Sequence, residues 1–125
     1  MKKIRFAVIV SVLSLAGLLS CSKKEEVKPT TTVLFFIKDS PNINIGNGAD
    51  LEFNGTIVGR ITRTLNTQPN CNASTSNSVI KIANVEIGVE HTYRFILSNG
   101  ISSRIFTFTI PTAPPKDGCW LQWVE

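Results

Sequence analysis

Residues 51–61 read LEFNGTIVGRI, and this stretch decides the fold class. Asn54-Gly55 separates two apolar segments and favours a two-residue type I′ turn, because both central positions of that turn need a positive φ angle. In such a turn Leu51 lies opposite Val58 on the partner strand. The stretch therefore predicts a β-hairpin in which Leu51 and Phe53 share the face turned toward the core.

The same sequence pattern continues through residues 32–125, where short apolar or alternating segments are separated by clusters of Asn, Gly, Ser and Pro. No window carries the 3.6-residue repeat of an amphipathic helix. Residues 33–38 (VLFFIK) are almost continuously apolar, which is typical of a strand buried on both faces. A second hairpin of the same kind is expected at Asn99-Gly100. The remaining strands are expected at residues 79–83, 91–97, 103–110 and 119–124.

Seven strands at this spacing in about 94 residues predict an all-β fold, a seven-stranded antiparallel two-sheet sandwich with immunoglobulin-like or transthyretin-like connections. The sequence has no internal repeat, so residues 32–125 are expected to form one domain. Alternation within the second hairpin predicts which side chains face the core: Tyr93, Phe95, Leu97, Phe106, Phe108 and Ile110.

The first 20 residues have the layout of a signal peptide. A basic start is followed by an apolar run at residues 6–19, which is shorter than the roughly 20 residues that span a bilayer. Residues 18–21 (LLSC) resemble the bacterial lipobox, in which a cysteine is acylated before the leader is removed. We therefore expect residues 1–20 to be cleaved and Cys21 to be lipidated. A plain secretory leader and an uncleaved membrane anchor are the alternatives.

Residues 21–31 are expected to be the lipidated cysteine and a flexible tether, because charges, Pro29 and threonines replace any apolar pattern. Two or three acyl chains anchor a protein stably without spanning the membrane. Ser22 differs from the aspartate of an inner-membrane retention signal, which favours the outer membrane. Residues 22–26 (SKKEE) resemble the export signal of surface lipoproteins in the Bacteroidetes. That resemblance implies display on the cell surface, and the periplasmic face is the alternative.

The chain has three cysteines, so lipidation of Cys21 would leave an even number, two, for a disulfide. The remaining two, Cys71 and Cys119, are expected to form a disulfide because an exported protein meets an oxidising compartment. A metal site would need further thiols or imidazoles, which the single histidine, His91, does not supply. No metal and no cofactor are therefore expected.

Charge and chemistry exclude two classes of function. Residues 32–125 carry seven Lys and Arg against seven Asp and Glu, so the domain lacks the basic stripe that nucleic-acid binding requires. His91 is expected at the surface or a sheet edge, which leaves no catalytic triad. Asp50 and Glu52 share one strand face and are expected to be solvated rather than an acid–base pair. Residues 39–50 offer oxygen ligands for calcium but lack EF-hand spacing. The sequence predicts a protein that is not an enzyme.

The last strand carries the candidate recognition residues. Trp120 and Trp123 are three positions apart, so their side chains point to opposite faces of a sheet. If Trp123 lies on the inner face, Trp120 projects outward beside Gln122, and these two form a platform for sugar or protein contacts. Burial of the outer tryptophan beneath the Pro-rich loop at residues 111–118 is the alternative.

Four further features occur together: the hairpin at residues 51–59, Cys71, the segment Val-Glu-x-Gly-x-x-x-x-Tyr at residues 85–93, and Cys119 at the start of the last strand. In these the domain resembles the small β-sandwich lipoproteins common in Bacteroidetes genomes, a resemblance that implies the fold and no particular function. The sequence predicts a lipid-anchored, surface-exposed, non-catalytic binding or structural module that contacts a glycan, a host protein or a partner lipoprotein. The alternative is a periplasm-facing accessory or enzyme-inhibitor lipoprotein that inserts the loop at residues 66–78 into a partner.

Overall fold

The computed structural model of the chain describes residues 25–115 and 118–125. The expected signal peptide at residues 1–20 and the expected lipidation site, Cys21, lie outside the described residues. Within the described ranges, no helix is long and apolar enough to cross a membrane. Of the expected tether at residues 21–31, residues 25–29 have no regular structure and have exposed side chains, whereas Thr30 and Thr31 already belong to the first strand.

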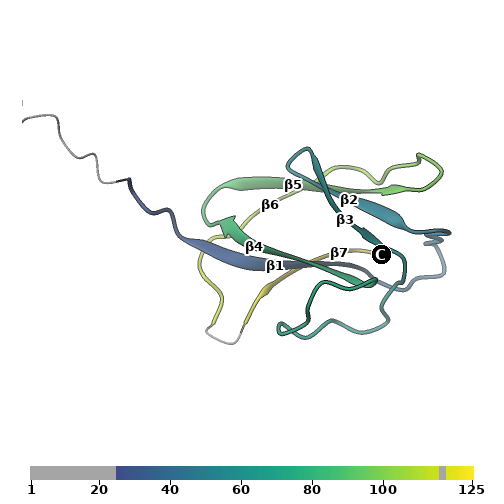
Figure 1. Cartoon of the computed structure of the whole chain (residues 1–125), viewed down its shortest axis with the longest axis horizontal. Coiled ribbons are helices and arrows are strands. Elements are labelled where there is room, and N and C mark those ends of the chain that lie inside the picture. The colour runs from purple at the N-terminus through teal and green to yellow at the C-terminus, as the bar shows by residue number, and fades with distance from the viewer. Residues whose placement is uncertain (1–24, 116–117) are drawn as a thin grey trace, which may run out of the picture.

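The described residues form seven strands in two sheets (Figure 1). The three-stranded sheet has the order β4-β1-β7, and the four-stranded sheet has the order β3-β2-β5-β6. This all-β, two-sheet arrangement confirms the expected fold class. The strands are β1 (Thr30–Ile37), β2 (Ala49–Phe53), β3 (Thr56–Ile61), β4 (Val79–Glu86), β5 (Glu90–Leu97), β6 (Phe106–Thr109) and β7 (Trp120–Val124).

One strand pair departs from the expected antiparallel sandwich. β1 and β7 are parallel, with Val33 opposite Trp120 and Ile37 opposite Val124, whereas the other four pairs are antiparallel. Parallel neighbours cannot be joined by a tight turn. Here the whole four-stranded sheet lies between them in the sequence. Its last strand, β6, returns the chain to the end of the molecule where β1 begins, because the N–H of Gly88 donates to the carbonyl of Ile110 and the N–H of Ile87 donates to that of Pro29. Both strands therefore finish at the same end.

The first hairpin forms at the expected turn. Asn54 and Gly55 have φ angles of 48° and 82°, as a type I′ turn requires. The register differs from the simple ladder, because Leu51 pairs with Gly59 and Val58 is an extra residue in a β-bulge. A Cβ atom at Gly59 would lie 2.9 Å from Cδ1 of Ile80, so glycine at this position lets β3 approach β4 closely.

The second turn is of a different kind from the first. Within this turn only Gly100 has a positive φ angle, 85°. Its N–H donates to the carbonyl of Leu97, and the N–H of Leu97 donates to the carbonyl of Ile101 across the turn. This is a three-residue connection with a type I turn and a bulge. Pairing continues past the turn, since the N–H of Ser103 donates to the carbonyl of Phe95, but Tyr93 pairs with Phe106, so the ladder is interrupted between them. β6 therefore begins at Phe106 rather than at Ser103. The core-facing residues are those expected, since Tyr93, Phe95 and Ile110 are buried.

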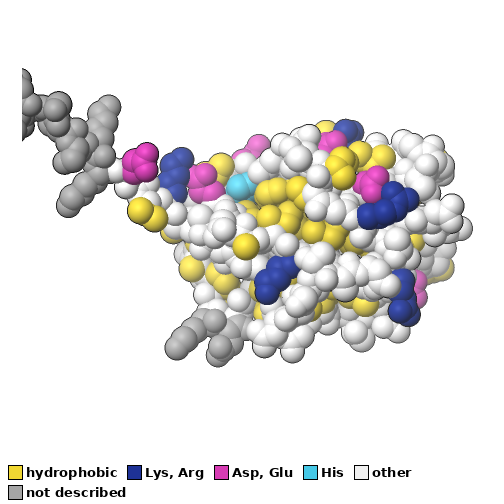
Figure 2. Space-filling model, in the orientation of Figure 1, with side chains coloured by type: hydrophobic (Ala, Val, Ile, Leu, Met, Phe, Trp, Pro, Cys, Tyr) yellow, Lys and Arg dark blue, Asp and Glu magenta, His cyan; other side chains and the backbone are white. Residues whose placement is uncertain are grey.

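β1 is buried on both faces, as its apolar sequence predicts. Val33, Phe35 and Ile37 belong to the main core between the sheets, and Leu34 and Phe36 belong to a second cluster on the opposite face of the three-stranded sheet. The second cluster also contains Val79, with Leu65, Cys119 and Leu121 packed against it. On the face seen in Figure 2, hydrophobic side chains are visible in a band between the two sheets.

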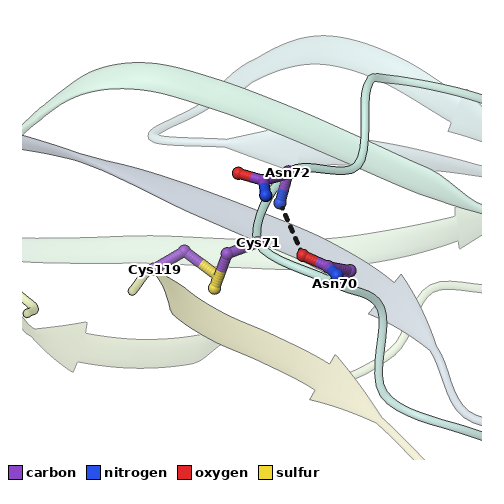
Figure 3. Close-up of a disulfide and its surroundings, with 4 residues drawn as sticks. All are labelled: Asn70, Cys71, Asn72 and Cys119. Atoms are coloured by element: carbon purple, nitrogen blue, oxygen red, sulfur yellow. Dashed lines mark hydrogen bonds between the residues drawn. A yellow bond between two sulfur atoms is a disulfide. The ribbon is translucent and has the colours of Figure 1, made fainter. Parts of the chain in front are cut away.

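The expected disulfide is present and closes this second cluster. Cys71 and Cys119 are joined with a Cα–Cα distance of 5.3 Å, which ties the loop at residues 62–78 to the start of β7 (Figure 3). Beside it, the backbone N–H of Asn72 donates to Oδ1 of Asn70 at 3.0 Å and tightens the loop. The disulfide therefore fixes the loop that supplies Leu65 to the cluster.

The orientation expected for the last strand is wrong. Trp120 packs against the main core, whereas Trp123 is 40% exposed and stacks on Phe36 with ring centroids 5.9 Å apart. Residues paired across two strands share a face, and the parallel register places Trp123 opposite the outward Phe36. Gln122 pairs with the inward Phe35 and is half-buried. Trp120 and Gln122 therefore do not form an exposed platform.

Candidate functional site

A cleft lies at the end of the sandwich opposite the tether, and we call it the distal cleft. It is lined by residues 42–46 of the loop between β1 and β2, by residues 97–99 and 101–103 around the turn between β5 and β6, and by Ile37, Phe95, Val124 and Glu125. Figure 1 shows both loops and the C-terminus at this end, and the tether at the other. The cleft has a volume of about 640 Å³.

The floor of the distal cleft is apolar. Ile37, Ile45 and Phe95 are buried beneath it and belong to the main core, so the floor is as firmly held as the core itself. Ile43 and Leu97 are half-buried and pack against that core. Ile101 stands at the wall with 62% of its surface exposed to solvent. An apolar group entering the cleft would remove the exposed parts of Ile43, Leu97 and Ile101 from water.

The rim of the cleft carries uncharged hydrogen-bonding groups. Oδ1 of Asn44 accepts the N–H of Gly46 at 2.9 Å, and Oδ1 of Asn99 accepts the N–H of Ile101 at 3.0 Å. Each amide oxygen is thus bound to its own loop, which fixes the orientation of the side chain. Within the described part of the chain, neither Nδ2 group makes a further hydrogen bond, so both are donors available to a ligand. The remaining polar residues of the lining are Asn42, Ser98, Ser102 and Ser103.

The lining contains a single charged residue, Glu125, and its charge is balanced. Oε2 of Glu125 lies 2.6 Å from Nζ of Lys38. The arrangement of an apolar floor, amide donors and hydroxyl groups can bind an uncharged group by contact and hydrogen bonding. Elsewhere in the described ranges, no three His, Cys, Asp or Glu side chains gather as metal ligands would.

His91 is not at the surface or a sheet edge as expected, because it is only 5% exposed. Its ring stacks on Phe53 with centroids 5.5 Å apart. Nε2 donates to the carbonyl of Glu86 at 2.7 Å, and a carbonyl can only accept, so the hydrogen lies on this nitrogen. Nδ1 then accepts from Nδ2 of Asn54 at 3.0 Å. The sequence contained the signal for this burial, since His91 continues the alternation through Tyr93.

The orientation of Asn54 is fixed independently, because its Oδ1 accepts the backbone N–H of Thr92 at 2.9 Å. His91 therefore links the first hairpin turn to the end of β4, at the tether end of the molecule. Its contacts are those of a structural histidine and do not involve the distal cleft.

The two carboxylates of β2 each face an arginine. Asp50 lies 2.8 Å from Nη1 of Arg60. Glu52 accepts two hydrogen bonds from Arg94, at 2.9 and 3.0 Å, and these bonds, with the charge of Glu52, raise the pKa of Arg94. Since each carboxylate has its own cation across the sheet, the pair forms ladder contacts on the polar face of the strand.

The sequence identified both loops of the distal cleft as loops but did not bring them together. Residues 40–48 and the turn at Asn99-Gly100 lie about 50 positions apart, and no local pattern indicates that they meet. The parallel pairing of β1 and β7, which was not expected, adds Val124 to the same place. Comparisons of the whole chain with models of protein families, with curated proteins and with solved structures found no match.

Proposed function

We propose that this chain is a lipid-anchored, surface-exposed binding module of a bacterial outer membrane that holds a partner in its distal cleft and carries out no catalysis. The observation that carries the proposal is the position of an apolar-floored cleft at the end of the domain opposite the tether. A concave site with an apolar floor and a few convergent polar groups is the usual form of a binding site.

The direction of β1 supports this geometry. The strand begins beside the tether at Thr30 and ends at Ile37, which lines the cleft. The eight residues of β1 span about 26 Å, and an extended tether from Cys21 to Thr30 adds up to about 30 Å. A domain anchored at Cys21 would present the cleft away from the lipid.

We also propose that the connections of the sandwich are transthyretin-like. In an immunoglobulin constant-type domain, the first strand lies beside the second in a sheet that also holds the fourth and fifth strands. Here β1 lies between β4 and β7, and β2 lies between β3 and β5. This strand order favours the transthyretin-like alternative.

The anchor and its side of the membrane are tested on cells that carry the chain with its leader. The expected mature protein begins at an acylated Cys21, and Cys21→Ser is expected to release the domain from the membrane fraction, as measured by mass spectrometry and fractionation. Protease added to intact cells is expected to remove the domain without lysis. Complete protection, with lysed cells as the control for cleavage, would support the periplasm-facing alternative.

The role of the cleft is tested with a matched pair of variants. Ile101 and Ile105 are 62% and 61% exposed, but only Ile101 lines the cleft. Partners are cross-linked and isolated from native membranes with the original chain, with Ile101→Asp and with Ile105→Asp. We expect a partner that is lost only with Ile101→Asp. A partner set that is unchanged in Ile101→Asp would contradict binding in the cleft.

The loop at residues 66–78 has contacts that support a covering role. Its middle is tied to β7 by the disulfide, and the carbonyl of Asn77 accepts N–H groups of Thr62 and Arg63 at 2.8 and 3.0 Å. A segment held at both places packs over the second hydrophobic cluster and is not a projecting arm. This favours the cleft over the loop as the place where a partner binds.

A further inference from the structure

The charge of the distal cleft limits the charge of its ligand. Glu125, the one charged residue of the lining, lies 2.6 Å from Nζ of Lys38. A charged ligand would lose its hydration on entering, and the only charged side chain of the described lining is already held in an ion pair. At this end of the molecule, Figure 2 shows Lys and Arg side chains with Asp or Glu side chains beside them, so charges of both signs occur together. The cleft therefore suits an uncharged ligand.

The floor argues against a sugar as the principal contact. Sugar rings bind proteins chiefly through flat aromatic faces, but the only aromatic residue of the lining, Phe95, is 3% exposed. The accessible apolar groups are branched aliphatic side chains, those of Ile43, Leu97 and Ile101. Such groups complement another bulky apolar side chain.

The rim argues against a plain hydrocarbon chain. Asn44 and Asn99 line the cleft and are exposed, and an acyl chain would offer their amide donors no acceptor. Peptide carbonyls are suitable acceptors. A cleft of about 640 Å³ also exceeds the needs of one side chain and leaves room for the peptide groups that flank it.

We infer that the distal cleft binds an uncharged peptide segment of a partner protein, with one bulky apolar side chain on the floor and the flanking peptide carbonyls at the Asn44 and Asn99 amides. This inference rests on the proposed function, since it names the ligand of the same cleft. The apolar side chain supplies most of the affinity by contact with the floor. The amides set the direction of the segment, because their oxygens are held by their own loops.

The test uses the lipidated chain in phosphatidylcholine vesicles and saturation-transfer difference NMR, which detects weak ligands of large particles. The probes are capped peptides Ac-GSGXGSG-NH2 with Leu, Phe, Asp or Lys at X, and the neutral sugar maltotriose. With vesicles alone as background, we expect transfer to the Leu and Phe peptides, at least about tenfold weaker binding of the Asp and Lys peptides, and none for maltotriose.

The matched variants assign the signal to the cleft. Ile101→Asp is expected to weaken binding of the Leu peptide at least about tenfold, and Ile105→Asp is expected to leave it unchanged. Preference for maltotriose or a charged peptide, absence of transfer to every peptide, or equal signals in the two variants would overturn the inference. If no peptide binds, but a partner captured from native membranes is still lost only with Ile101→Asp, then the inferred ligand class is wrong and the proposed function stands. If no partner depends on Ile101, the proposed function fails as well.

Discussion

Removal of the disulfide is expected to lower the free energy of unfolding by about 4 kcal/mol. Cys71 and Cys119 are 48 positions apart, and the bond closes that whole segment in the unfolded chain. In the chain-entropy model, the entropy lost by closing a loop of this length gives the stated value at 25 °C. Domains of this size are stable by about 5–15 kcal/mol, so the loss is a large part of the total.

The perturbation is the double variant Cys71→Ala, Cys119→Ala, which leaves no unpaired thiol in the domain. Urea unfolding is followed by tryptophan fluorescence. With a slope of about 1–1.5 kcal/mol per molar urea, the midpoint is expected to fall by about 3 M. The original chain reduced with a phosphine is the second arm, and it should unfold near the midpoint of the double variant, because both lack the same cross-link.

Three outcomes would refute this reasoning. A loss below about 1 kcal/mol with an unchanged slope would show that the closed segment is already restricted in the unfolded chain. A reduced original chain that unfolds like the oxidised one would show that packing, and not the cross-link, holds the loop. Detection of two free thiols in the exported protein by mass spectrometry would remove the premise.

Three further predictions concern other parts of the domain. Gly48 has a φ of +113°, and a Cβ there would lie 2.8 Å from a backbone oxygen. Gly48→Ala should therefore lower the free energy of unfolding by about 2 kcal/mol or more, against about 1 kcal/mol for Gly46→Ala, where a Cβ meets no atom within 4 Å. Equal losses of the two variants in urea unfolding would contradict the steric argument. Asn54→Gly keeps the turn but removes the hydrogen bonds to His91 and to the backbone, and should cost about 1–2 kcal/mol in thermal unfolding; no loss would show that these bonds contribute nothing. Burial raises the pKa of Tyr93, the only tyrosine, above 10.0. The protonated Tyr93 therefore contributes fully to the free energy of unfolding below the ordinary pKa of tyrosine, and this contribution is lost as the pH rises through the pKa of the folded state. Formation of the phenolate in the folded protein at the ordinary pKa, measured by absorbance, would contradict this.

Local chemistry predicted the elements of the fold well. Asn54-Gly55 makes the turn whose two positive φ angles it favours, and the apolar residues 33–37 are buried on both faces of their strand. The bulge at Val58 was not predictable in this way, because it accompanies the close approach of Gly59 to Ile80 on a distant strand.

Long-range pairing decided what the sequence left open. Alternation placed Trp120 and Trp123 on opposite faces but did not say which face was inward, and the parallel register with β1 made that choice. The candidate site was missed for the same reason. Its floor comes from strands that alternation could identify, whereas its position depends on two loops and a C-terminal strand meeting at one end.

The shared direction of β1 and β7 has a practical consequence for anyone handling this protein. A tag joined after Glu125 begins at the mouth of the cleft, where it would compete with the peptide ligand proposed above. Ser74, an exposed residue beside the turn on the loop held by the disulfide, is a safer attachment point for a label. In a binding screen, a fusion on the loop should leave binding intact, whereas a fusion at the C-terminus should reduce it. A negative result obtained with a C-terminal tag would therefore reflect the tag and not the protein.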